Sequence, residues 1–352
     1  MKIEEVEQCS FQNWYNNFKN VSVKSIILPL PDDFIKYILA DGIILPKSTN
    51  VSHVVSTNDS DLSDEEETWE EDTDEAEPEA PYFPEFDQSI ENAIESLGGK
   101  VFPKLNWSSP KDASWMGFNY SCCSTSISDI YLLLKSSNFI IHDITQPYNL
   151  CDDFIQDQSL SEIEQKNIPL FLVLRKWIDI DTSGEFRCFV KENKLIGVCQ
   201  REHSAFFEHI NLHKAEILED LVTFFTEKVQ FKFPLPNYIY DVYRKKKDKV
   251  ILIDFNPFGK VTDSLLFTWE ELNSDLTSVD ENDEYPEFRC VEDNYGVQPR
   301  TLSSYAVPTD IIDISTGEDS FKLVDLMKLK IEAQNESSDD ENNAESNGTQ
   351  NE

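Results

Sequence analysis

Two neighbouring apolar stretches near the middle of the chain constrain its fold more than any other feature. The first runs from Tyr238 to Arg244 and the second from Val250 to Phe258, and both are rich in β-branched and aromatic residues. Such stretches are typical of β-strands, and the charged segment between them, residues 245–248, predicts a tight turn. The sequence therefore predicts an antiparallel hairpin at this point.

The register of this hairpin brings three oxygen-bearing side chains together. With the turn centred near Lys247 and Asp248, Asp241 lies opposite Asp254. Asn256 points to the same face as Asp254 because side chains alternate along a strand. Facing carboxylates repel each other unless a cation lies between them, and magnesium prefers oxygen ligands. The three residues are the predicted metal ligands, and the alternative is solvated aspartates paired with lysines of the turn.

The composition is that of a folded protein with strongly acidic segments. The chain has 352 residues, of which 39% are hydrophobic and 12% aromatic, and its net charge is −37. Residues 51–80 hold 13 acidic residues and residues 331–352 hold 7, with no Lys or Arg in either. We expect a disordered loop and a disordered tail there. The acidic balance argues against nonspecific nucleic-acid binding and favours a partner with a basic face.

The sequence shows no pattern of a signal peptide, a membrane helix or a cysteine motif. Residues 1–8 contain no apolar signal core, and no stretch approaches the roughly 18 apolar residues of a membrane helix. The seven cysteines are scattered, without a CxxC pair or a Cys/His cluster of zinc spacing. We expect a cytosolic, monomeric protein with reduced thiols and no membrane association.

Helices and strands alternate along the chain in a mixed order. Helices are predicted near residues 6–18, 32–41, 87–97, 126–135, 214–229 and 268–272, and further strands near 25–30, 101, 170–174 and 185–200. This pattern predicts an α+β protein with an antiparallel sheet in the larger lobe. We expect a small lobe over 1–165, a large lobe over 166–330 and the tail over 331–352. No GxGxxG or Walker A sequence occurs, so any nucleotide needs another scaffold.

One candidate site lies at the end of a predicted buried strand. The apolar run Leu170–Leu174 is followed directly by Arg175, Lys176, Trp177 and Ile178. Backbone groups at this junction could bind the edge of an adenine, and a flat Trp beside a branched aliphatic residue suits a purine pocket. The alternative is that Trp177 and Ile178 are ordinary core residues.

A second candidate is a cation on a predicted hairpin. In the strand that begins at Glu185, alternation places Glu185 and Arg187 on one face. A guanidinium there offers a two-point fork to phosphate. The alternative for Arg187 is a surface salt bridge.

A third candidate is Lys104, which follows a strand and opens a loop rich in Ser and Trp. An ammonium in such a loop can act as a point charge on phosphate. Asn106, Trp107 and Ser108 in the same loop are further candidate cofactor contacts. The alternative for Lys104 is a solvated side chain.

Together, these cations and the three-oxygen site resemble the ATP-grasp fold, in which a small lobe supplies a lysine and a large lobe supplies metal ligands around a nucleotide. Five longer strings sharpen the resemblance. They are FPKLNWS (102–108), LVLRKW (172–177), EFRCFVKENKLIG (185–197), IDFNPFG (253–259) and VTDSLLFTWEEL (261–272). These strings resemble the eukaryotic cell division cycle protein 123 family, over roughly residues 5–310 and including the position of the acidic insertion.

This resemblance implies a two-lobed ATP-grasp protein that binds ATP and Mg²⁺. It also implies an assembly factor for translation initiation factor 2, which docks on the C-terminal domain of the gamma subunit and promotes its joining with the alpha subunit. Translation initiation and cell-cycle progression would depend on that assembly. Carried over to this sequence, Lys104 and Arg187 approach phosphate, Arg175 to Ile178 line the adenine site, and Asp241, Asp254 and Asn256 hold magnesium.

Other functions remain open at this point. Many ATP-grasp proteins are ligases, so a ligase or kinase acting on a carboxylate is an alternative to a chaperone that is not an enzyme. A nucleotidyl-lysine ligase is disfavoured because the sequence after Lys104 lacks the Lys-x-Asp-Gly pattern. An acidic interaction scaffold without nucleotide is the third alternative. We expect the ATP-binding assembly chaperone.

Overall fold

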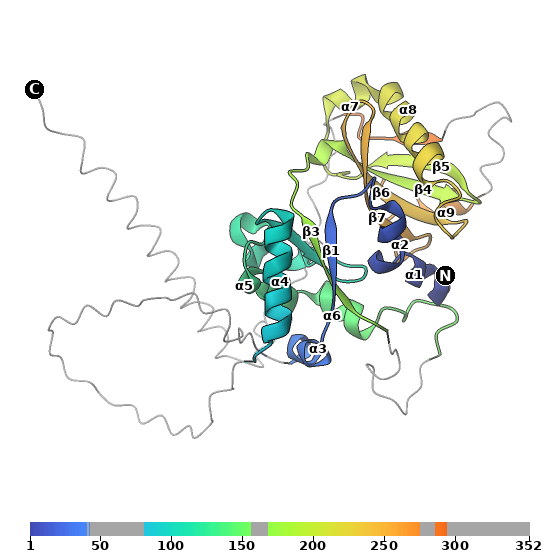
Figure 1. The fold of residues 1–352 in the computed structure, drawn as a ribbon. Helices are drawn as coiled ribbons and strands as arrows, with labels where there is room; N and C mark the ends of the chain where they lie inside the picture. The colour runs from blue at the N-terminus through green and yellow to red at the C-terminus, as the bar shows by residue number, and fades with distance from the viewer. Residues whose placement is uncertain (41, 43–80, 156–167, 275–285, 294–352) are drawn as a thin grey trace, which may run out of the picture. The chain divides into compact units, whose positions relative to one another are not determined.

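The computed structural model describes residues 1–40, 42, 81–155, 168–274 and 286–293 (Figure 1). All of them belong to one compact unit, Met1–Thr301. The acidic segments expected at 51–80 and 331–352 lie outside the described residues, and so does the lobe boundary expected at 165/166. Those three expectations stay predictions.

The first of two sheets has three antiparallel strands in the order β1-β3-β2. The strands are β1 (Ser25–Pro29), β2 (Val101–Lys104) and β3 (Phe171–Lys176). Leu172 and Leu174 of the central strand share a buried apolar cluster with four helices. These are α3 (Asp32–Leu39), α4 (Pro84–Leu97), α5 (Ile127–Lys135) and α6 (Asn138–Thr145). Because side chains alternate, Val173 and Arg175 face away from those helices.

The second sheet has five strands in the order β7-β6-β4-β5-β8. They are β4 (Glu185–Lys191), β5 (Lys194–Gln200), β6 (Tyr238–Lys246), β7 (Lys249–Pro257) and β8 (Glu287–Arg289). All neighbours are antiparallel except β5 and β8, which are parallel. The expected α+β class with an antiparallel sheet is confirmed, and the parallel edge pair was not anticipated.

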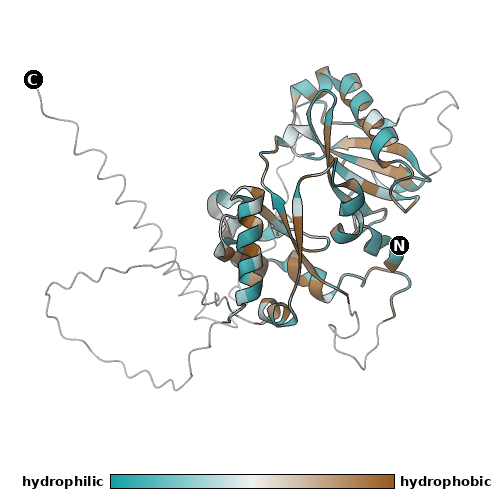
Figure 2. Cartoon of the chain, viewed as in Figure 1, coloured by the Kyte–Doolittle hydropathy of each residue, from teal (hydrophilic) through white to brown (hydrophobic). Residues whose placement is uncertain are grey.

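The remaining helices complete the described fold. They are α1 (Ile3–Gln8), α2 (Phe11–Phe18), α7 (Glu208–Leu212), α8 (Lys214–Phe224) and α9 (Trp269–Asn273), with short turns η2 (Lys111–Met116), η3 (Phe118–Tyr120), η4 (Thr182–Gly184) and the π-helical η5 (Phe225–Val229). Side chains of α2 and α8 pack with one face of the five-stranded sheet in the largest apolar cluster, which also contains Val173 of the other sheet. Figure 2 shows apolar residues concentrated in the strands. No helix in the described ranges is both long and apolar enough to cross a membrane.

Several predicted helix boundaries were wrong for identifiable reasons. The helix expected over 6–18 is broken at Cys9 and Ser10, because the Phe11 N–H donates to the carbonyl of Asn106 (2.8 Å) instead of continuing α1. The helix expected to start at residue 87 begins earlier, at Pro84, and the buried Asp87 carboxylate accepts a hydrogen bond from the Tyr131 hydroxyl.

Other local predictions are confirmed by capping contacts. Ser126 caps α5 and accepts from the Asp129 N–H (3.1 Å), with the Asp129 carboxylate returning the contact. Thr268 and Glu271 form the same reciprocal pair at the start of α9. Such capping boxes satisfy amide donors that a helix N-terminus otherwise leaves free.

Candidate functional site

Three charged side chains lie in a row across three neighbouring strands of the larger sheet. Arg187 of β4 is the register partner of Asp241 in β6, and Asp241 is the register partner of Asp254 in β7. The predicted pairing of Asp241 with Asp254 is therefore confirmed. Immediately beyond it the register shifts, since Val242 pairs with Leu252 and Ile253 is the extra residue of a bulge. Bulges re-aim side chains and recur beside functional sites.

Arg187 holds Asp241 through a two-point ion pair. Its Nε and Nη2 atoms each donate to a carboxylate oxygen at 2.8 Å, and Nη1 donates to the Asp263 carbonyl at 2.6 Å. Both residues are buried. Burial raises the pKa of Asp241, but the guanidinium groups of Arg187 and Arg201 outweigh burial and lower the pKa to about 2. The fork predicted for phosphate is thus directed at a carboxylate in this structure.

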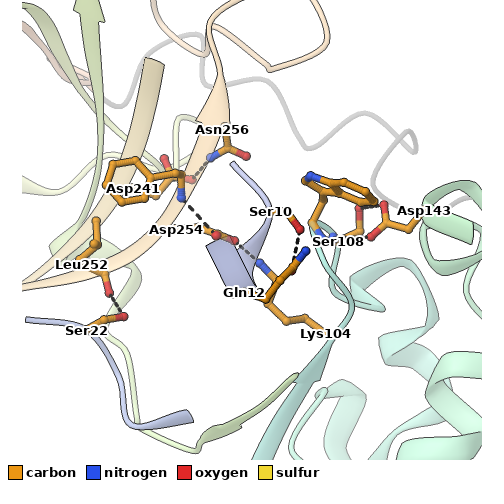
Figure 3. Close-up of polar contacts among 12 residues, drawn as sticks. Ser10, Gln12, Ser22, Lys104, Ser108, Asp143, Asp241, Leu252, Asp254 and Asn256 are labelled. Atoms are coloured by element: carbon orange, nitrogen blue, oxygen red, sulfur yellow. Dashed lines mark hydrogen bonds and ion pairs between the residues drawn. The ribbon is translucent and has the colours of Figure 1, made fainter. Parts of the chain in front are cut away.

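Lys104 reaches from the smaller sheet to the other carboxylate of the row. Its Nζ lies 2.5 Å from Asp254 Oδ2, and its side chain is almost completely buried (Figure 3). Desolvation lowers the pKa of Lys104 although the Asp254 charge opposes the shift. The lysine of the 101–104 strand and the carboxylate of the hairpin therefore meet in one place.

Phe11 supports two buried cations at this place. Its ring centroid lies 5.2 Å from Lys104 Nζ and 5.3 Å from Arg175 Cζ. The Nε and Nη2 atoms of Arg175 are buried and have no hydrogen-bond partner among the described residues. Burying donors without partners is costly. The Phe11 ring and the nearby Asp254 charge stabilise the Arg175 guanidinium and offset part of that cost.

We expect Phe11→Leu to destabilise the protein more than a matched core substitution does. The variant loses ring volume and two cation–π contacts, which together should lower the free energy of unfolding by about 2–4 kcal/mol. Phe189→Leu, in an equally buried ring of β4 that contacts one other aromatic ring, is the control and should cost at least about 1 kcal/mol less. Urea denaturation of both variants measures the difference, and equal losses would show that the ring acts only by its volume.

The loop after Lys104 is held by contacts within the chain. Asn106 is fully buried, donates to the Pro169 carbonyl (3.0 Å) and accepts from the Phe171 N–H (2.8 Å). Trp107 Nε1 donates to the Val6 carbonyl (2.8 Å). The Ser108 N–H and hydroxyl both donate to Asp143 at 2.7 Å. The polar groups of these three candidate cofactor contacts are thus engaged in fixing the loop.

Asp143 of α6 is the anchor of that loop. Burial raises its pKa to about 6, although hydrogen bonds from Ser108 and Trp107 oppose the shift. We expect Ser108→Ala to raise this pKa further, because the hydroxyl donor favours the carboxylate, and to lower the free energy of unfolding at pH 7 by about 1 kcal/mol. Carboxyl NMR titration measures the pKa, and an unchanged midpoint would contradict the assigned hydrogen bond.

The predicted adenine junction lies at the end of β3. Trp177 and Ile178 are half-buried and Lys176 is exposed. The Trp177 N–H donates to the Lys100 carbonyl (3.0 Å), its Nε1 donates to Asp179 (3.0 Å), and its ring lies 6.4 Å from that of Phe102. The aromatic surface predicted for a purine is present, while the backbone N–H is already used.

Sequence reasoning missed three charged residues of this region. Arg201 Nε lies 3.4 Å from Asp241 Oδ2, and Lys111 in η2 interacts electrostatically with Arg201, Asp241 and Glu185. Burial raises the pKa of Glu185, and the two cations oppose that shift. Asp143 lies on a helix that was not predicted. Arg201 directly follows the predicted 185–200 hairpin, which was the one available signal.

The donor set suits a hard cation with additional ligands from outside the chain. Asp241, Asp254 and Asn256 occupy adjacent strands, and Asn256 Nδ2 lies 3.4 Å from Asp241 Oδ2 (Figure 3). Within the described ranges no group of three His, Cys, Asp or Glu residues could hold a metal. Two carboxylates and an amide match magnesium, which commonly takes one or two carboxylates beside phosphate oxygens.

The fold described above also occurs in a solved structure. The C-terminally truncated Cdc123 from Schizosaccharomyces pombe superposes with a TM-score of 0.65 and 32% identity, covering 83% of this chain and 99% of that one. The family model named D123 matches residues 14–315. The chain belongs to the D123 family, which confirms the resemblance drawn from the five sequence strings.

Full-length relatives carry a functional name. The Xenopus laevis protein "Translation initiation factor eIF2 assembly protein" is 46% identical over 346 residues, which cover 97% of this chain and 100% of the relative. A Dictyostelium discoideum protein of the same name is 36% identical. The matched region covers 92% of this chain and 95% of that protein.

Proposed function

We propose that this chain is an ATP- and magnesium-binding assembly factor for eIF2. The observation that carries the proposal is the 46% identity with an eIF2 assembly protein across 97% of the chain. Similarity over nearly the whole length of both proteins makes a shared role in eIF2 assembly the simplest reading. The location expected from the sequence, the cytosol, suits that role.

The nucleotide part of the proposal is supported by the charged row and the cations around it. Asp241, Asp254 and Asn256 would hold the metal, and Lys104 and Arg187 would face the phosphates. Arg175, whose buried Nε and Nη2 atoms have no partner in the part of the chain that the structure describes, lies two residues before the half-buried Trp177 of the proposed adenine position. When bound, magnesium and the triphosphate would supply charge that links the smaller sheet to the larger one.

The client part of the proposal is the gamma subunit of eIF2, through its C-terminal domain. The net charge of −37 supports a client with a basic face, because attraction between opposite charges raises the rate at which two proteins associate. We propose that the assembly factor holds the gamma subunit in a state that joins the alpha subunit. In this proposal ATP stabilises the binding-competent arrangement and is not consumed.

Reconstitution tests both parts. Purified gamma and alpha subunits are mixed with wild type or Asp254→Asn, with and without ATP and magnesium, and complex formation is followed by size-exclusion chromatography. We expect the wild type with ATP and magnesium to give the most complex. Assembly that is unaffected by the wild-type protein would contradict the client role, and full activity of Asp254→Asn would contradict the nucleotide role. Phosphate release or a mass increase of the client would instead indicate a kinase or ligase.

A further inference from the structure

Each carboxylate of the proposed metal site already has a cation from the protein itself. Asp241 is paired with Arg187 at 2.8 Å and approached by Arg201 at 3.4 Å. Asp254 is paired with Lys104 at 2.5 Å. These protein cations therefore relieve the repulsion expected between the two facing carboxylates.

The two ion pairs differ in how firmly the cation is held. Arg187 makes three hydrogen bonds, two to Asp241 and one to the Asp263 carbonyl, so its planar group is fixed by geometry. The Lys104 ammonium makes one hydrogen bond within the described residues, to Asp254, besides its contact with the Phe11 ring. An ammonium on a flexible stem re-aims more easily than a guanidinium fork. Lys104 is the exchangeable cation of the site.

We propose that Lys104 is an internal counter-ion for Asp254, so that the site accepts a divalent cation only together with a phosphate group that gives Lys104 a new partner. This inference rests on the proposed nucleotide site and adds its binding order. The lysine keeps the metal position closed to free divalent ions and opens it to a metal–phosphate pair.

Electrostatics supports this coupling. A bare divalent cation at Asp254 would lie beside the buried Lys104 ammonium and near the Arg175 guanidinium, and would deprive both of the one carboxylate they share. Like charges in a buried setting repel strongly because little solvent screens them. A phosphate oxygen delivered with the metal supplies the missing anion. Because linkage is reciprocal, phosphate raises metal affinity by the factor by which metal raises phosphate affinity.

The test uses manganese in place of magnesium, since both take oxygen ligands and manganese is visible by EPR. Binding of Mn²⁺ without nucleotide is measured for wild type, Lys104→Met and the double variant Lys104→Met/Asp254→Asn. Lys36→Met is the matched control, because it removes the same charge from an exposed lysine of α3. We expect Lys104→Met to bind Mn²⁺ at least tenfold more tightly than wild type. The control should match wild type, and the double variant should lose the gain.

A second arm needs no variant. We expect wild type to bind ATP with magnesium at least tenfold more tightly than ATP in a chelator, and to bind Mn²⁺ at this site at least tenfold more weakly without ATP than with it. Wild type that binds Mn²⁺ alone as tightly as Lys104→Met would overturn the inference, and so would no gain in a folded Lys104→Met. If Lys104→Met does not fold, the wild-type arm alone decides. Failure of wild type to bind ATP at all would contradict the proposed nucleotide site. The comparison of Mn²⁺ binding by wild type and Lys104→Met would still show whether Lys104 prevents Asp254 from binding a free divalent ion.

Discussion

Replacing Asp241 with alanine should lower the free energy of unfolding by about 3–5 kcal/mol at pH 7, because it leaves a buried guanidinium without its carboxylate. Arg187 is fixed at 2.8 Å to both oxygens of Asp241, and both side chains are largely shielded from solvent. The remaining contact, to the Asp263 carbonyl, cannot neutralise the charge. Urea denaturation of wild type and variant gives the difference.

Two controls separate this effect from a general loss of charge. Asp33→Ala breaks the exposed Asp33–Lys36 pair and should change stability little, as surface pairs do. Replacing both partners, Arg187→Met with Asp241→Leu, should recover much of the loss, since paired apolar residues remove the uncompensated charge. A loss in Asp241→Ala as small as in Asp33→Ala would mean that Arg187 does not depend on this partner.

Asp254→Ala should be the second most damaging substitution, with a loss of about 3–5 kcal/mol, because it leaves the buried Lys104 without its ion-pair partner. The sequence alone predicts a different result. In that prediction Asp254 is only a metal ligand, and Asp254→Ala weakens metal binding while the fold stays intact. Lys104→Met/Asp254→Ala is the control, and it should be more stable than Asp254→Ala alone.

The loss in Asp254→Ala should depend on pH in a defined direction. Without Asp254 the pKa of Lys104 falls further below the unfolded value of about 10.4. Between the folded and unfolded pKa values the unfolded chain binds more protons, so stability rises with pH. The deficit of Asp254→Ala relative to wild type should therefore shrink between pH 7 and 10. A deficit that is constant over this interval would show that Lys104 is not the cause.

The local geometry of the site could be predicted from the sequence. Alternation and a turn centred near Lys247 and Asp248 predict Asp241 opposite Asp254, and this pair is observed. The strands contain two register shifts between the turn and the pair, one between Arg244 and Lys246 and one between Asp241 and Val242, and the two shifts cancel. The bulge at Ile253 could not be predicted, because nothing in the spacing distinguishes an unpaired residue from a paired one.

The charge pairing of the site could not be predicted, because it depends on strands that are distant in sequence. On the side away from β7, the neighbour of β6 in the sheet is β4, and this places Arg187 on Asp241 although 54 positions separate them. Lys104 and Asp254 are 150 positions apart and belong to different sheets. Periodicity identifies which residues face a common surface, but it does not identify which partner each charge finds there. The same limit hid Asp143, whose three contacts run from α6 to the loop after β2.

The most direct test of the central claim is calorimetric titration of wild type and Asp254→Asn with ATP, in the presence and absence of magnesium. The account predicts binding by wild type that requires magnesium, and at least tenfold weaker binding by Asp254→Asn at a temperature where circular dichroism shows both proteins folded. No binding by wild type, or equal binding by both proteins, would contradict a nucleotide and metal site at this row of side chains.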